Sequence, residues 1–327
     1  LINRSVTPTT IDEPWLDVME GVQQSIQRIT AVTGRQLIGE SGRLIRPTRT
    51  SGSGVDHFGA LVSAAPPMRT LIVGLFEDVS IASARRLLHT IYAEEVDCFS
   101  LADTRSESEQ IQAIIKQQPD LFLIVGGTDG GAENRLLDML DVVDIGIQAL
   151  AGSKRIQVLY AGNRQLREKV AQKLGDYANV QVADNIRPSL DREDLTDATQ
   201  LLSELYEDIK VGPLPGVQEL RDWCSIPLAS PARRFAKQIE YLAHAYDGRI
   251  MGVDLGAGSV TLVDATRSQT RTFIQSRLGM GQAIVNVMDI VSPEELANHL
   301  PVPMTAEHVE NFIRNKAVQP RSIPMVD

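Results

Sequence analysis

Apolar and polar positions form a regular alternation of two kinds of segment between residues 69 and 183. The predicted strands are the short apolar runs at 70–76, 96–101, 121–125, 156–161 and 180–183. The predicted helices are the longer amphipathic stretches at 80–93, 107–117, 133–151 and 164–174. Strands that are apolar throughout and joined by helices are typical of a parallel sheet with both faces covered. Ligands of such sheets gather beyond the carboxyl ends of the strands.

The flanking regions have other patterns. A helix-start signal at residues 10–14 predicts a helix over 14–33, and residues 33–54 predict a long loop. The segment 191–247 is mainly helical, with a break at 212–216 and a second helix near 231–246. Beyond it the pattern predicts a hairpin starting at residue 250, a third strand at 271–276, a turn at 279–281, and helices at 282–290 and 293–299. Residues 319–327 follow no regular pattern.

The hairpin carries a glycine-rich turn between two strand-like runs. A dinucleotide fingerprint needs a helix directly after its glycines, and a strand follows here, so that interpretation is excluded. Asp254 ends the first strand, and the turn contains Gly256, Ala257 and Gly258. Exposed backbone N–H groups of such a turn can hold a phosphate while the aspartate faces Mg²⁺. A plain glycine-rich β-turn is the alternative.

A second glycine cluster follows the predicted strand at 121–125. It reads Gly126-Gly127-Thr128-Asp129-Gly130-Gly131 and precedes a helix, so its backbone N–H groups could bind an anion. The alternative is a tight turn in which Asp129 only caps the helix. Polar residues also follow two other predicted strands, namely Asn163, Asp184 and Asn185. Neighbouring parallel strands would bring these residues to one cleft.

Composition narrows the class of protein. The chain has 327 residues, is 43% hydrophobic, and carries 32 basic and 42 acidic residues for a net charge of −10. This balance argues against non-specific binding of nucleic acid, and no apolar run is long enough to span a membrane. The two cysteines form no paired motif, which favours a reduced cytoplasmic setting. The five histidines lack metal-ligand spacing. The abrupt strand-like start at Leu1 indicates a piece of a longer protein.

Asp254, Gly256, Gly258 and Thr261 together resemble the second phosphate-binding motif of the actin/Hsp70/sugar-kinase ATPase superfamily. A more specific resemblance covers nearly the whole chain in order. It is carried by residues 63–69, 73–75, 126–131, 161–164, 184–188 and 253–256. This series is similar to the MutL (GlmL-type) glutamate mutase accessory family, and the cluster at 126–131 is its most specific part.

The resemblance implies an α/β protein with a truncated actin-like (ribonuclease H-like) ATPase fold and an inserted parallel, doubly wound α/β unit. On this basis residues 1–66 are the remainder of the first ATPase lobe, without its first phosphate motif, and residues 67–190 are the α/β unit. Residues 191–247 form a helical connection, and residues 248–327 start an incomplete second lobe.

The resemblance also implies a function: an ATPase that activates or reactivates an adenosylcobalamin-dependent mutase such as glutamate mutase. Asp254 would orient Mg²⁺ or the attacking water. The backbone amides of Gly256, Ala257 and Gly258, together with Thr261, would hold the β- and γ-phosphates. The partners are then ATP and a mutase subunit, without nucleic acid or membrane; whether the chain forms a homodimer stays open.

Three departures from the family pattern limit what this chain is expected to do alone. The first phosphate motif and the adenosine-binding Gly-Gly motif are not found, and Pro66-Pro67 stands where Gly-Gly is expected. We therefore expect ATP hydrolysis from the full-length protein, and weak or no ATP binding by the 327 residues alone. The alternative function is a non-catalytic module that recognises a cobalamin protein or a nucleotide through the loops at 126–131, 162–164 and 184–187.

Overall fold

The computed structural model describes residues 3–131, 133–152, 155–320 and 322, and the chain divides into two compact units. Unit 1 comprises Leu1–Pro66 and Leu205–Arg234, and unit 2 comprises Pro67–Glu204 and Phe235–Asp327. Two helices, α6 (Thr196–Tyr206) and α8 (Pro231–Ala245), carry the chain from one unit to the other. The stretch 191–247, treated above as one helical connection, is thus shared between the units. The assignment of ATPase lobes to parts of the chain stays a prediction.

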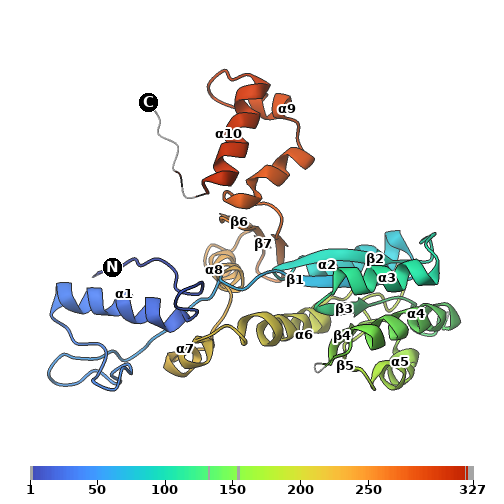
Figure 1. Cartoon of the computed structure of the whole chain (residues 1–327), viewed down its shortest axis with the longest axis horizontal. Helices are drawn as coiled ribbons and strands as arrows, with labels where there is room; N and C mark the ends of the chain where they lie inside the picture. The colour runs from blue at the N-terminus through green and yellow to red at the C-terminus, as the bar shows by residue number, and fades with distance from the viewer. Residues whose placement is uncertain (1–2, 132, 153–154, 321, 323–327) are drawn as a thin grey trace. The chain divides into compact units, whose positions relative to one another are not determined.

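A five-stranded parallel sheet lies in unit 2 (Figure 1). Its strands are β1 (Met68–Val73), β2 (Ala93–Phe99), β3 (Leu121–Ile124), β4 (Ile156–Tyr160) and β5 (Ala178–Val182). They are ordered β2-β1-β3-β4-β5, and every neighbouring pair is parallel. The chain builds outward from β1 in both directions, which is the order of a doubly wound sheet with its switch point between β1 and β3. The predicted parallel α/β fold is confirmed.

The connections between these strands are helical. They are η1 (Glu77–Ile81, a π-helical turn) with α2 (Ala82–Leu88), then α3 (Glu107–Gln117), α4 (Asn134–Leu150), and η2 (Arg164–Leu166) with α5 (Arg167–Leu174). Helices α3, α4 and α5 lie side by side along one face of the sheet (Figure 1). Helix α3 begins at a capping box in which the Ser106 hydroxyl accepts from Glu109 N–H and the Glu109 carboxylate accepts from Ser106 N–H.

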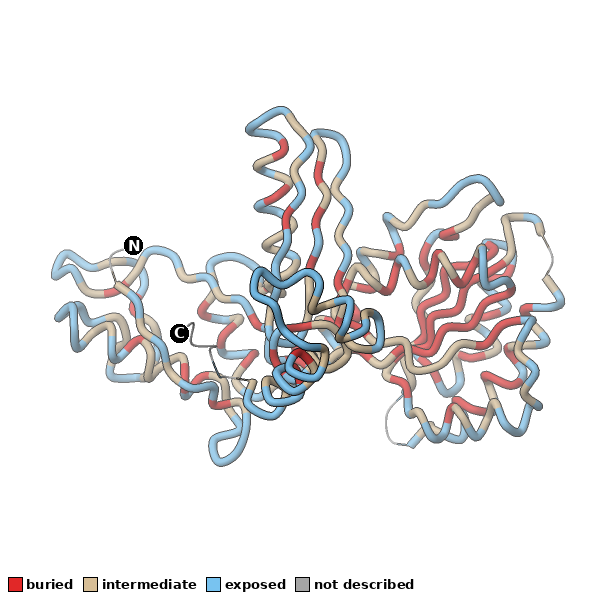
Figure 2. Tube along the Cα trace, turned by 90° about the horizontal axis from the view of Figure 1, so that it is seen from above, coloured by how far each residue is buried: buried red, intermediate tan, exposed pale blue. Residues whose placement is uncertain are grey.

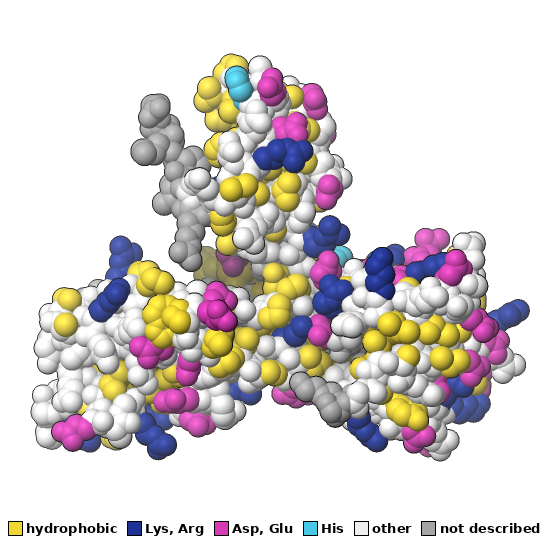
Figure 3. Space-filling view, in the orientation of Figure 1, with side chains coloured by type: hydrophobic (Ala, Val, Ile, Leu, Met, Phe, Trp, Pro, Cys, Tyr) yellow, Lys and Arg dark blue, Asp and Glu magenta, His cyan; other side chains and the backbone are white. Residues whose placement is uncertain are grey.

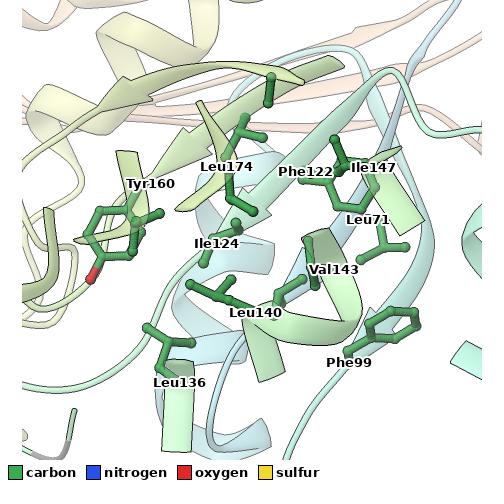
Figure 4. Close-up of a cluster of buried hydrophobic side chains, with 14 of the residues drawn as sticks. Leu71, Phe99, Phe122, Ile124, Leu136, Leu140, Val143, Ile147, Tyr160 and Leu174 are labelled. Atoms are coloured by element: carbon green, nitrogen blue, oxygen red, sulfur yellow. The ribbon is translucent and has the colours of Figure 1, made fainter. Parts of the chain in front are cut away.

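The core of the α/β unit explains why its strands read as unbroken apolar runs. Phe122 and Ile124 of β3 pack with Leu140 and Val143 of α4 in one cluster (Figure 4). Leu123, which projects to the opposite face, is also 0% exposed. Because both faces are covered, every position of β3 must be apolar. Figure 2 shows the strands of this sheet as the most continuously buried part of unit 2.

A smaller antiparallel sheet follows in unit 2. It consists of β6 (Ile250–Leu255), β7 (Val260–Ala265) and β8 (Thr270–Gln275), in that order. Helix α8 covers one face, where Ile239 packs with Val263. Gly252 of β6 belongs to this contact, since a Cβ there would lie 2.5 Å from Ile239. The other face exposes Met251 and Val253 of β6. The predicted hairpin and third strand are confirmed.

Three helical segments end the chain: η4 (Gln282–Asp289), α9 (Pro293–Asn298) and α10 (Ala306–Val318). The pattern of apolar residues does not predict α10. Its apolar stripe is thin, because only Val309 and Ile313 are buried. The residue that indicates the start of this helix is Thr305, whose hydroxyl accepts from His308 N–H and caps the helix. The region 323–327 lies outside the described residues.

Unit 1 contains α1 (Val18–Thr33), η3 (Glu207–Val211) and α7 (Val217–Trp223). The predicted start of the first helix at residue 14 is wrong by four residues. Asp17 is the N-cap and accepts from Met19 N–H at 2.8 Å, and Leu16 has a φ of 50°, which a helix cannot contain. The long loop between residues 33 and 54 is held by its arginines, since the Arg46 guanidinium donates to Trp223 O at 2.7 Å.

Basic and acidic side chains are interspersed on the face of unit 2 seen in Figure 3. Many are paired: Arg85 contacts Glu95 at 2.8 Å, and Arg86 contacts Glu193 at 2.6 Å. Both carboxylates of these pairs are partly buried, and Arg85 donates two hydrogen bonds to Glu95. Among the residues that the structure describes, no helix combines the length and apolarity needed to cross a membrane.

Candidate functional site

The hairpin of β6 and β7 places Asp254 directly opposite Thr261 in the strand register. Directly paired residues of antiparallel strands project to the same face, so both side chains lie on one side of the hairpin. Asp254 is exposed, whereas Thr261 is 3% exposed. The turn between the strands is closed by a hydrogen bond from Gly256 N–H to Ser259 O at 2.9 Å.

A second loop, residues 279–281, holds this turn in place. Met280 N–H donates to Gly256 O at 2.9 Å, and Gly281 N–H donates to Ala257 O at 2.8 Å. Two carbonyl oxygens of the turn are therefore already bonded to protein. The N–H groups of Ala257 and Gly258 donate to no acceptor within the described residues. A turn with bonded carbonyl oxygens and free N–H groups can accept an anion.

The close approach of the two loops requires glycine at both ends of the second one. A Cβ at Gly279 would lie 2.5 Å from Ala257 O, and a Cβ at Gly281 would lie 2.7 Å from the same oxygen. Real Cβ atoms do not come so near a carbonyl oxygen, so neither position accepts a side chain without moving the turn. From the sequence, residues 279–281 are predicted only as a turn, and this supporting role is not predicted.

The hairpin residues fit a magnesium nucleotide in their chemistry. In the described part of the chain the Asp254 carboxylate has no hydrogen-bond or ion-pair partner, which leaves it free to contact a cation or a water molecule. No group of three or more His, Cys, Asp or Glu residues within that part is arranged to hold a metal ion. Mg²⁺ at phosphate sites commonly takes one or two carboxylates and completes its shell with phosphate oxygens and water. A single aspartate beside an anion-binding turn matches that pattern.

The second glycine cluster lies at the carboxyl end of β3, where Gly126, Gly127 and Gly130 all have positive φ. Its one carboxylate, Asp129, is bonded inside the protein. Asp129 Oδ1 accepts from Arg164 N–H at 3.0 Å and from the Asn185 side-chain amide at 2.9 Å. The Asn185 amide also donates to Gly127 O at 3.0 Å. In this structure Asp129 and Asn185 therefore join the loops that follow β3, β4 and β5.

The other predicted residues of this cluster are placed differently. Asn163 is 0% exposed; its Oδ1 accepts from Gln165 N–H at 3.1 Å, while its Nδ2 has no partner among the described residues. Asp184 is exposed and forms an ion pair with Arg167 at 2.7 Å. Thr128 and Gly131 close the loop through a hydrogen bond from Gly131 N–H to Thr128 O. The three predicted strand ends do meet at one edge of the sheet.

The network around Asp129 predicts a pH dependence of stability. Burial alone would raise the pKa of Asp129, but the hydrogen bonds from Asn185 and Arg164 outweigh it and lower the pKa below the ordinary 3.8. A carboxyl group with a lowered pKa stabilises the folded state at pH values above its ordinary pKa. This contribution is lost as the pH falls below the ordinary pKa and through the lowered pKa of the folded state.

We expect Asp129→Asn to lower the melting temperature at neutral pH, and the difference from wild type to shrink below pH 3.8. Thermal unfolding followed by circular dichroism across pH 2–7 measures it. A difference that stays constant with pH would contradict this role of the carboxylate.

The hairpin and the glycine cluster lie at opposite ends of the parallel sheet. Ser276, just after β8, donates from its hydroxyl to Ala93 O at the amino end of β2, at 2.5 Å. Gly126 follows the carboxyl end of β3. A six-residue strand such as β1 spans about 20 Å, which is therefore the scale of the separation. The structure thus groups Asp254, Gly256, Ala257, Gly258 and Thr261 in one place and the remaining predicted residues in another.

The fold and these two loop clusters define an α/β protein with a doubly wound parallel sheet and a separate antiparallel sheet whose first turn can bind an anion. The MutL protein family matches residues 1–327, so the chain belongs to that family. The chain is also similar to Protein MutL of Clostridium tetanomorphum, with 21% identity over 314 residues. That match covers 89% of this chain and 62% of the relative, so the chain spans less than two thirds of the relative's length. The family expected from the sequence motifs is confirmed.

Proposed function

We propose that the protein is an ATPase-type accessory protein that activates or reactivates an adenosylcobalamin-dependent mutase such as glutamate mutase. The observation that carries the proposal is the hairpin turn, whose free N–H groups stand beside the unpaired carboxylate of Asp254. Membership of the MutL protein family supports the accessory role. Both the ATP chemistry and the mutase partner are part of the proposal.

Each part of the hairpin has a role in this function. The N–H groups of Ala257 and Gly258 would bind the phosphate chain, with Gly256 setting the turn and Thr261 contributing its hydroxyl. Asp254 would bind Mg²⁺ or orient the water that attacks the γ-phosphate. Transfer of a phosphoryl group needs positioning and charge stabilisation more than covalent chemistry, so few side chains suffice. Mg²⁺ would supply neutralisation of the charge that develops on the phosphate oxygens.

The accessory role can be tested with a damaged mutase. Glutamate mutase carrying an inactive cobalamin is incubated with the protein as its gene encodes it, with Mg²⁺ and ATP, and with fresh adenosylcobalamin. We expect mutase activity to return in step with ATP consumption, and not to return with ADP or a non-hydrolysable ATP analogue. The Asp254→Ala variant should restore no activity.

The outcome that would overturn the proposal is recovery of the mutase at the same rate without ATP, or no ATP consumption by the intact protein. Recovery without ATP would favour the alternative function, a non-catalytic module that recognises a cobalamin protein.

A further inference from the structure

The phosphate turn has a neighbour from the α/β unit. The hydroxyl oxygen of Tyr92 lies 3.4 Å from the position that a Cβ atom would take at Gly258. Apart from the neighbours of Gly258 in the sequence, no other heavy atom of the described residues lies within 4 Å of that position. Tyr92 directly precedes β2, whereas Gly258 lies between β6 and β7, so this contact joins segments far apart in the chain. The hydroxyl therefore lies beside the turn whose N–H groups are free.

Three contacts fix the position of Tyr92 relative to the hairpin. Ile274 N–H of β8 donates to His89 O at 2.6 Å, and the Ser276 hydroxyl donates to Ala93 O. The His89 ring packs edge-on against Phe273, with ring centroids 4.4 Å apart. These contacts hold the backbone on both sides of Tyr92. Its place beside Gly258 is thus set by the packing of β8 against the α2–β2 connection.

The Tyr92 hydroxyl is available as a hydrogen-bond donor. In the residues that the structure describes it has no hydrogen-bond partner, although the side chain is half-buried. Burial, and then the nearby charge of Glu94, raise the pKa of Tyr92, so the hydroxyl keeps its proton at neutral pH. A neutral hydroxyl that faces an anion-binding turn can donate to a phosphate oxygen without adding charge.

We propose that Tyr92 is a nucleotide-binding residue, whose hydroxyl donates to a phosphate oxygen of ATP held in the turn formed by residues 256–259. This inference rests on the proposed ATPase function. It extends the site beyond the hairpin, because the α/β unit then supplies a ligand contact of its own. Bound phosphate becomes linked to the amino end of β2 through one side chain.

The test is Tyr92→Phe in the protein as its gene encodes it, with Mg²⁺-ATP and adenosine titrated separately by calorimetry. Phenylalanine keeps the ring and removes the donor. A hydrogen bond to a charged group contributes enough that its loss weakens binding by about tenfold or more. We expect that loss for ATP and no change for adenosine. Tyr177→Phe, in the connection before β5, is the matched control and should leave both affinities unchanged.

A second variant keeps the test decisive if Tyr92→Phe does not fold. In Gly258→Ala the new methyl group enters the space between turn and hydroxyl at an ordinary contact distance, and the backbone angle of Gly258 accepts alanine. This variant should weaken ATP binding. The double variant, Tyr92→Phe with Gly258→Ala, should lose no more ATP affinity than the weaker-binding single variant, as expected for groups that share one interaction.

Two results would overturn the role of Tyr92 and leave the proposed function standing: wild-type ATP affinity in Tyr92→Phe, or additive losses of affinity in the double variant. No ATP binding by the wild-type protein would overturn both.

Discussion

Replacing Asp254 with alanine is expected to lower ATP hydrolysis by about a hundredfold or more and to leave the fold intact. The carboxylate is exposed and has no protein partner in the described residues, so its removal leaves no buried group unpaired. In the proposed mechanism the same carboxylate binds Mg²⁺ or orients the attacking water. Steady-state phosphate release by the intact protein measures the loss, and thermal unfolding measures the fold.

A matched control separates this effect from a change of surface charge. Asp176, in the turn between α5 and β5, is also an exposed aspartate, and Asp176→Ala should hydrolyse ATP as wild type does. Asp254→Asn should behave like the alanine variant, because an amide is a poor ligand for Mg²⁺ in place of a carboxylate. Unchanged turnover in either Asp254 variant would remove this residue from the mechanism.

Replacing Gly279 with alanine is expected to cost about a hundredfold in kcat/KM for ATP, although residue 279 contacts no nucleotide in the proposed site. The new Cβ would lie 2.5 Å from Ala257 O, so the turn must move by an amount on the order of 1 Å. Misplacement of this size can reduce catalysis by about a hundredfold. The Asp254 carboxylate itself is unchanged, so the loss should come from the displaced turn. Steady-state hydrolysis over a range of ATP concentrations measures it.

The control is Gly248→Ala, at the start of the same sheet. A Cβ there would meet its nearest atom, Tyr246 O, at 3.7 Å, which is an ordinary contact, and its backbone angle accepts alanine. Wild-type kcat/KM is expected. If Gly279→Ala also retained wild-type values, the 279–281 loop would not support the site, and the turn would have to be held by its strands alone.

Local patterns in the chain predict most of the α/β unit. The strand runs need no long-range knowledge, because burial on both faces forces every residue of a strand such as β3 to be apolar. The sequence also predicts the Asp254 hairpin, since β-branched residues follow its glycines. Where several local signals compete, the prediction fails: Pro14 suggested a helix start, but the positive φ of Leu16 delays it to residue 18.

The supports of the candidate site were not predictable in this way. Gly281 N–H donates to Ala257 O, and the Tyr92 hydroxyl lies beside Gly258. Both contacts join segments that are apart in the chain, and neither produces a periodic pattern in the sequence. The position of the Gly126–Gly131 cluster was also open from sequence alone. Only the parallel order of the strands shows that this loop lies at the other end of the sheet from the hairpin, with Asp129 bonded to Asn185.

Each unit is assembled from two separate stretches of chain, and this has a consequence for synthesis on the ribosome. The strands of the parallel sheet all lie between Met68 and Val182, so this sheet can form from neighbouring segments as soon as they emerge. Unit 1 must wait, because its first stretch ends at Pro66 and its second begins at Leu205. Residues 1–66 therefore lack the second stretch of unit 1 until residues 67–204 have been translated.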